Sequence, residues 1–93
     1  MTVATARHIL VDSEGFCAEL KQKIIDGTDF SDAAREFSTC PSGGRGGDLG
    51  SFHPGQMVRE FDAVVFSAPL NEVQGPVQTQ FGYHLIEVTS RQD

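Results

Sequence analysis

Hydrophobic and polar positions alternate along the first residues of the chain. In the segment VATARHILV, residues 3–11, every second residue shares one face of an extended chain. The residues on one such face are Ala4, Ala6, His8 and Leu10. A period of two is typical of a strand, so the pattern predicts a strand at residues 3–11 with one side buried.

The end of the chain repeats this alternation. Two extended pieces are predicted within residues 75–90, and in the second one His84, Ile86 and Val88 share a face. If this strand lay antiparallel beside residues 3–11, His8 and His84 would project from the same face and could hydrogen-bond as neutral imidazoles. The pattern alone leaves a simpler alternative open, in which each histidine is an ordinary core residue.

Between these strands the hydrophobic spacing becomes helical. In DSEGFCAELKQKIIDG, residues 12–27, Phe16, Leu20 and Ile24 recur every four residues, and the segment starts with capping residues and ends with glycine. A helix is therefore predicted there.

Two further helices and one short strand complete the prediction. The second helix begins after the capping residue Asp29 and ends before Pro41, and the third spans residues 57–68. The segment DLGSF, residues 48–52, reads as a short strand. The predicted order is β-α-α-β-α-β-β, in a single domain of residues 1–93.

Composition and charge narrow the classes of protein. A hydrophobic fraction of 39% fits a folded globular domain, and no segment has the roughly 20 apolar residues of a membrane span. A net charge of −6 argues against nucleic acid or an anionic membrane as a partner. The N-terminus lacks the features of a secretory signal, so we expect a cytoplasmic protein, and Met1 with no linker favours a complete chain.

The cysteines and histidines show no metal-binding spacing. Cys17 and Cys40 are not arranged as C-x-x-C, so both are expected to be thiols, and neither a metal nor another cofactor is predicted.

The stretch CPSGGRGGDLGSFHPGQM, residues 40–57, has six glycines in eighteen residues. A linker, a phosphate-binding loop or the rim of an active site could have this composition. A phosphate-binding loop is excluded because the ending Gly-Lys-Ser/Thr is missing and a strand, not a helix, follows.

Three blocks of sequence resemble the signatures of the parvulin family of peptidyl-prolyl cis/trans isomerases. They are ARHILV, CPSGGRGGDLGSFHPGQMVREFDAVVF and GPVQTQFGYHLIEV. The blocks stand in the family's order, and the run R-G-G-D-L-G-x-F-x-x-G-Q-M followed by F-D is highly specific. The chain is most similar to the small, stand-alone bacterial members.

The resemblance implies a fold and an activity. The fold would be α+β, a four-stranded antiparallel sheet surrounded by helices and similar to the FK506-binding proteins. The activity would be isomerisation of X-Pro peptide bonds in proline-containing peptides and in unfolded or partly folded proteins, by a monomer without cofactors. A non-catalytic peptide-binding chaperone module of the same fold is the alternative.

The resemblance also implies roles for individual residues. The substrate-binding residues would be Leu49, Met57, Phe61 and Phe81. The catalytic hydrogen-bond network would consist of His8, Cys40, Thr79 and His84. The glycines permit positive φ and close approach, so we expect the loop of residues 43–50 to fold tightly beside the site, with low mobility away from its Arg45 tip. We expect Arg45 and Asp48 to hold this loop, with direct contact to the substrate as the alternative.

The residue types at the site bear on the role of Cys40. The thiol of Cys40 could attack the substrate carbonyl, but related parvulins often have Asp there, which favours a polar role instead.

Family members that act on phosphorylated residues before proline have basic residues in the loop after the first strand. Here that loop contains Asp12 and Glu14 and no arginine, so we expect an uncharged, apolar residue before proline.

Overall fold

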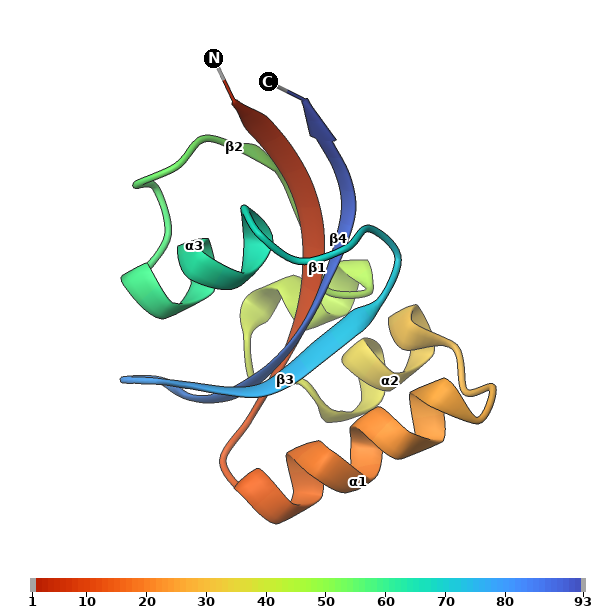
Figure 1. Cartoon of the computed structure of the whole chain (residues 1–93). Helices are drawn as coiled ribbons and strands as arrows, with labels where there is room; N and C mark the ends of the chain where they lie inside the picture. Colours follow the sequence, from red (N-terminus) through yellow and green to blue (C-terminus); the bar gives the residue numbers. More distant parts are fainter. Residues whose placement is uncertain (1, 93) are drawn as a thin grey trace.

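The computed structural model describes residues 2–92 and contains four strands, three α-helices and one 3-10 helix (Figure 1). In chain order they are β1 (Val3–Val11), α1 (Glu14–Ile25), α2 (Phe30–Phe37), η1 (Pro41–Arg45), β2 (Asp48–Phe52), α3 (Arg59–Val65), β3 (Val73–Thr79) and β4 (Gly82–Gln92). The predicted order of strands and α-helices is confirmed. None of the helices within these residues has the length and hydrophobicity that crossing a membrane requires.

The strands form one antiparallel sheet in the order β2-β1-β4-β3, as expected for the α+β fold. The first and last strands are therefore the two central ones. Helices α1 and α2 pack against one face of the sheet and α3 packs against the other (Figure 1). The site described below lies on the α3 side of the sheet.

The second face of the central strands is also buried, over the part that contains Ile9, Val11 and Leu85, where the alternation predicted only one buried side for residues 3–11. On the α3 side the buried cluster is Ala4, Ala6, Phe52, Phe61, Val65, Ala68, Ile86 and Val88. On the other side it is Ile9, Val11, Cys17, Leu20, Phe30, Ala33, Ala34 and Leu85. The difference arises because α1 and α2 cover the second face.

The helix boundaries follow their caps. The side chain of Ser13 accepts a hydrogen bond from the Phe16 N–H at the start of α1, and Asp29 does the same for Asp32 in α2. Helix α2 ends earlier than predicted, because residues 38–40 are extended and the Thr39 N–H donates to the Leu10 carbonyl at 2.8 Å.

Helix α3 is shorter than the predicted segment 57–68. Val58 occupies its N-cap position, so Met57 precedes the helix in place of starting it. The hydrophobic spacing continues beyond both ends of the helix because Met57 and Ala68 still pack against the same core cluster.

The glycine-rich stretch contains a 3-10 helix, η1, that the sequence did not predict. After it, Gly47 lies directly against β1, where its carbonyl accepts a hydrogen bond from the His8 N–H at 3.0 Å. Its φ is +84°, and a Cβ atom there would lie 2.3 Å from the His8 carbonyl oxygen. Only glycine fits this contact.

We expect Gly47→Ala to lower the free energy of unfolding by about 3 kcal/mol, since both the positive φ and the backbone clash oppose a side chain. Gly44→Ala is the matched control, because Gly44 has open space around it and no positive φ; its effect should stay within about 0.5 kcal/mol. Urea unfolding of both variants measures the difference. Equal stability of the two variants would show that the contact with β1 is not tight.

Candidate active site

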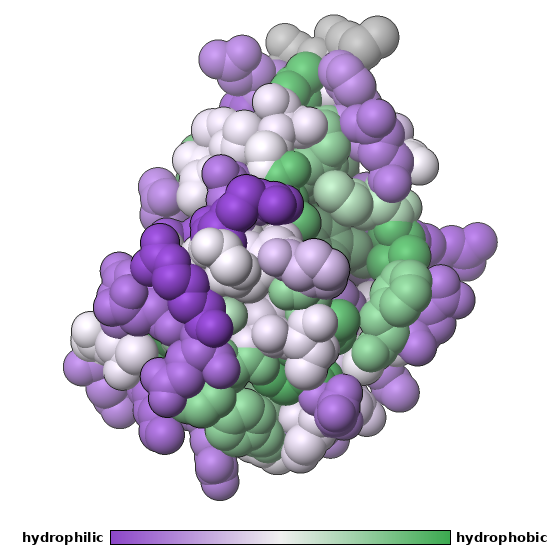
Figure 2. Space-filling model, turned by 180° about the vertical axis from the view of Figure 1, so that it is seen from behind, coloured by the Kyte–Doolittle hydropathy of each residue, from purple (hydrophilic) through white to green (hydrophobic). Residues whose placement is uncertain are grey.

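A cavity of about 390 Å³ opens beside the central strands, between η1, β2 and α3. We call it the apolar cavity. Its lining residues are His8, Leu10, Thr39, Cys40, Pro41, Leu49, Met57, Val58, Phe61, Phe81 and His84. The lining contains no Asp, Glu, Lys or Arg. In the space-filling view, hydrophobic side chains gather on the side of the molecule where α3 lies, to the right (Figure 2).

The floor of the apolar cavity consists of two buried histidines on adjacent strands. In the register of β1 with β4, His8 lies opposite Ile86 and Leu10 opposite His84, so the two histidines are diagonal neighbours on one face. Their Nδ1 atoms are 3.0 Å apart and their rings are stacked, with an interplanar angle of 18°. The pairing expected from the alternation is confirmed.

A chain of hydrogen bonds leads from His8 to Cys40. The Ser42 hydroxyl donates to Cys40 Sγ at 3.3 Å and also lies 3.1 Å from His8 Nε2. Because the hydroxyl hydrogen is directed at the sulfur, His8 Nε2 carries the proton that binds Ser42. Nδ1 of neutral His8 is then an acceptor, so the proton between the two rings belongs to His84.

The same logic extends the chain in the other direction. Nε2 of neutral His84 must accept, and it lies 2.7 Å from the Thr79 hydroxyl, which can donate to it. The Thr79 oxygen in turn accepts from the Phe81 N–H at 3.1 Å. Every bond therefore points the same way, from the Phe81 backbone to the Cys40 sulfur, and the tautomers of both histidines are assigned by the network.

Burial keeps both imidazoles uncharged. Desolvation, together with the neighbouring His84, lowers the pKa of His8 from 6.5 to about 4. Desolvation also lowers the pKa of His84. At neutral pH the two rings are therefore neutral, which agrees with one proton shared between the Nδ1 atoms.

The walls of the apolar cavity come from Leu49 in β2, from Met57 just before α3, and from Phe61 in α3. The Phe61 ring stands nearly perpendicular to both histidine rings, with centroid separations of 5.6 Å to His8 and 5.8 Å to His84. Phe61 thus joins wall to floor and fixes the depth of the cavity.

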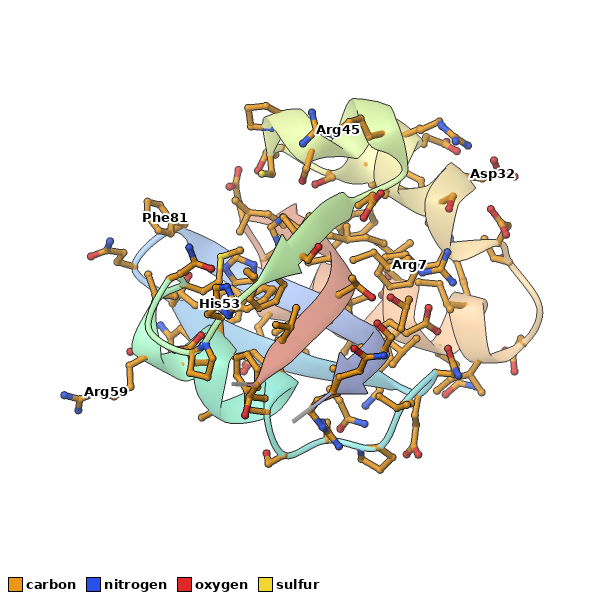
Figure 3. All side chains as sticks on the ribbon, turned by 90° about the horizontal axis from the view of Figure 1, so that it is seen from above. Arg7, Asp32, Arg45, His53, Arg59 and Phe81 are labelled. Carbon is orange, nitrogen blue, oxygen red and sulfur yellow. The ribbon has the colours of Figure 1, made fainter. Side chains whose placement is uncertain are left out.

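Phe81 forms the rim. It lies in the turn between β3 and β4, its side chain is 59% exposed, and it projects at the edge of the molecule (Figure 3). An exposed aromatic side chain beside an apolar cavity can cover the chain of a bound peptide.

The structure brings the eight predicted site residues together. All of them line the apolar cavity except Thr79, which is buried behind His84 and reaches the site through it. Ser42, which connects His8 to Cys40, was not predicted from the sequence. Its position depends on the turn of η1, which the glycine-rich sequence did not reveal.

The expectation for the loop of residues 43–50 is only half supported. Asp48 holds the turn, since its Oδ1 accepts from the Gly50 N–H at 2.9 Å. The Arg45 side chain makes no hydrogen bond or ion pair within residues 2–92, and it lines a separate polar cavity with Arg7 and Ser31. This cavity is also lined by Gly46 and Asp48 of the same loop, and the holding role of Arg45 stays a prediction. The low mobility of the loop stays a prediction.

The second thiol has no part in the site. Cys17 is fully buried between α1 and the sheet, and burial raises its pKa to about 11. Both cysteines are free, as expected. Within the described part of the chain, no group of three or more His, Cys, Asp or Glu side chains is arranged to hold a metal ion.

Comparison with known proteins points to one domain family. The family described as PPIC-type PPIASE domain matches residues 2–92. The foldase protein PrsA of Geobacillus kaustophilus is 47% identical over 88 residues, which cover 94% of this chain and 31% of that protein. The chain therefore spans about a third of the length of such relatives.

Solved structures have the same fold. The crystal structure of the peptidylprolyl isomerase PrsA from Bacillus anthracis has a TM-score of 0.96 at 36% identity, over 99% of this chain and 43% of that one. The solution structure of NmPin, the parvuline of Nitrosopumilus maritimus, has a TM-score of 0.87 at 31% identity, over 97% of this chain and 98% of that one.

The depressed pKa values predict how stability depends on pH. Below pH 6.5 the unfolded chain protonates His8, whereas the folded chain resists protonation down to about pH 4. The free energy of unfolding should therefore fall as the pH is lowered through this window, by about 3 kcal/mol from His8. His84 acts in the same direction.

Urea unfolding between pH 7 and pH 5 measures this slope before most carboxylates titrate. His8→Asn should flatten it, because the side chain that resists protonation is then absent. An unchanged slope in His8→Asn would show that the floor histidines do not resist protonation.

Proposed function

Because the chain belongs to the PPIC-type, or parvulin, family of peptidyl-prolyl cis/trans isomerases, we propose that its apolar cavity binds the proline ring and promotes rotation without forming a covalent bond. The domain is a peptidyl-prolyl isomerase that assists folding. The observation that carries the mechanism is the cavity itself, an uncharged pocket closed below by two neutral, hydrogen-bonded histidines.

The reaction needs no bond to be made or cleaved. Rotation about an X-Pro bond is opposed by about 18–20 kcal/mol because the amide loses its resonance in the twisted state. In that state the carbonyl oxygen is less negative and the nitrogen is pyramidal. Isomerisation otherwise takes tens of seconds, so turnover at about 10 per second requires roughly 10³-fold acceleration, on the order of 4 kcal/mol.

The walls of the apolar cavity supply part of this rate acceleration. Leu49, Met57 and Phe61 would grip the pyrrolidine ring and exclude water from it. A planar amide is well solvated by water, and the twisted amide is less polar at its oxygen. Moving the bond into an apolar site therefore disfavours the planar forms more than the twisted one.

The chain of hydrogen bonds orients the side chains that face the substrate. Since every donor in it is already directed at an acceptor, the side chains facing the substrate keep fixed positions and need no rearrangement during rotation. Cys40, at the end of the chain, presents a polar edge to the substrate while its sulfur accepts from Ser42.

The same geometry opposes a covalent mechanism. A cysteine nucleophile needs an adjacent base to take its proton. Neither histidine makes a hydrogen bond to Cys40 within residues 2–92, and each ring's only lone pair is already used as an acceptor in the network. The thiol is therefore assigned a polar role.

Partners follow from the site and from the relatives. The relatives named foldase PrsA and chaperone SurA support binding of unfolded proteins or proline-containing peptides. A monomeric state and a cytoplasmic location remain predictions from the sequence.

Substrate preference should follow the charge around the cavity. The loop after β1 exposes Asp12 and Glu14, and Arg59 extends away from the molecule (Figure 3). We expect the catalytic efficiency to fall from Leu-Pro to Glu-Pro to phosphoserine-Pro peptides, by about tenfold or more overall. A protease-coupled assay on the three peptides measures it. A preference for the phosphopeptide would refute the proposed specificity, and absence of turnover on all three would favour a non-catalytic binding module.

Cys40→Asp tests the non-covalent mechanism. Because Asp is a poor carbonyl nucleophile but can accept from Ser42, we expect this variant to keep at least about a tenth of the wild-type efficiency. The same assay on a Leu-Pro peptide measures it, with circular dichroism as a control for folding. A folded variant without activity above background would support covalent catalysis.

A further inference from the structure

Met57, a wall of the apolar cavity, lies outside regular secondary structure. It ends the segment HPGQM, residues 53–57, which links β2 to α3. Gly55 in this segment is exposed, has a φ of +91° and would have open space around a Cβ atom. A loop of this kind has high conformational freedom, so other contacts must hold Met57 against the cavity.

The first half of the loop is held by its own residues and by the chain near β1. The His53 N–H donates to Gln56 Oε1 at 2.5 Å, and the His53 side chain donates from Nδ1 to the Thr2 carbonyl at 3.1 Å. These contacts fix the loop on the side that leaves β2.

The turn is closed by Gln56, whose N–H donates to the His53 carbonyl at 3.3 Å. The link from the loop to α3 comes from one side chain of that helix. The Gly55 N–H donates to Asp62 Oδ2 at 2.6 Å, a short bond to a carboxylate. Asp62 directly follows Phe61, so the residue that anchors the loop is fixed by the same helix turn that places the opposite wall of the cavity.

The other carboxylate oxygen makes this arrangement costly. Asp62 Oδ1 is buried and has no hydrogen-bond partner within residues 2–92. A buried polar atom without a partner reduces stability. The cost of this carboxylate in stability must be offset by another contact. The only hydrogen bond of its side chain in the described chain is the one to Gly55 in the loop.

We propose that Asp62 is a positioning residue for catalysis: by holding Gly55 it keeps Met57 in place as a wall of the proline pocket. This inference rests on the proposed function of the apolar cavity. Besides its share in excluding water from the rotating bond, Met57 touches the proline ring itself, and this contact is made by planar and twisted substrates alike. Loss of the anchor should therefore raise KM more than it lowers kcat.

The experiment is a double-mutant cycle on Asp62 and Met57, assayed with a Leu-Pro peptide. Asp62→Ala should lower kcat/KM about tenfold, mainly through KM, and should have less than about a twofold effect when Met57 is already Ala. Asp62→Asn keeps an acceptor for Gly55 and should stay within about threefold of wild type. Glu60→Ala, an exposed carboxylate on the same helix, is the matched control and should be neutral.

Additive effects of Asp62→Ala and Met57→Ala would overturn the proposal, as would an equal loss in kcat and kcat/KM. Amide hydrogen exchange at Gly55 gives a readout that does not depend on activity. In the wild type this exposed amide should be protected, and Asp62→Ala should remove the protection.

Rapid exchange at Gly55 in the wild type would refute the anchor even if the variants fail to fold. A wild-type domain that turns over no peptide would refute the proposed function, while the exchange measurement would still decide whether Asp62 holds the loop.

Discussion

One proton shared by two buried imidazoles determines the rest of the site. The Nδ1 atoms of His8 and His84 are close enough that only one of them can be protonated. Burial disfavours a second proton on either ring, so the pair stays neutral and each tautomer fixes the other. The ring that carries the proton between the Nδ1 atoms determines which way the hydrogen bonds at the Cys40 sulfur and at the Thr79 hydroxyl point.

This constraint explains why the site lies in the centre of the sheet. Two histidines can meet in this way only on adjacent strands with a defined register, and the pairing of β1 with β4 provides it. Packing on both faces of these strands then holds the register, since a slip by one residue would exchange the two buried faces. Phe61 completes the arrangement from α3, because its ring packs nearly perpendicular to both imidazoles.

The sequence predicted what depends on periodicity and on specific motifs. Alternation placed His8 and His84 on one face, and the parvulin signatures identified most of the residues that line the cavity. It did not predict features that depend on packing between distant segments. The burial of both sheet faces requires knowing where α1 and α2 lie. The role of Ser42 requires the 3-10 turn of η1.

The pairing of Val3 with Gln92 has a mechanical consequence. The two ends of the fold leave the sheet at the same corner, so fraying or a pulling force at the ends would unzip β1 from β4 one residue pair at a time. The Leu10–His84 pair lies near the opposite end of this ladder. The part of the sheet that carries the histidines is thus among the last to open, and local fraying at the chain ends leaves the cavity floor intact.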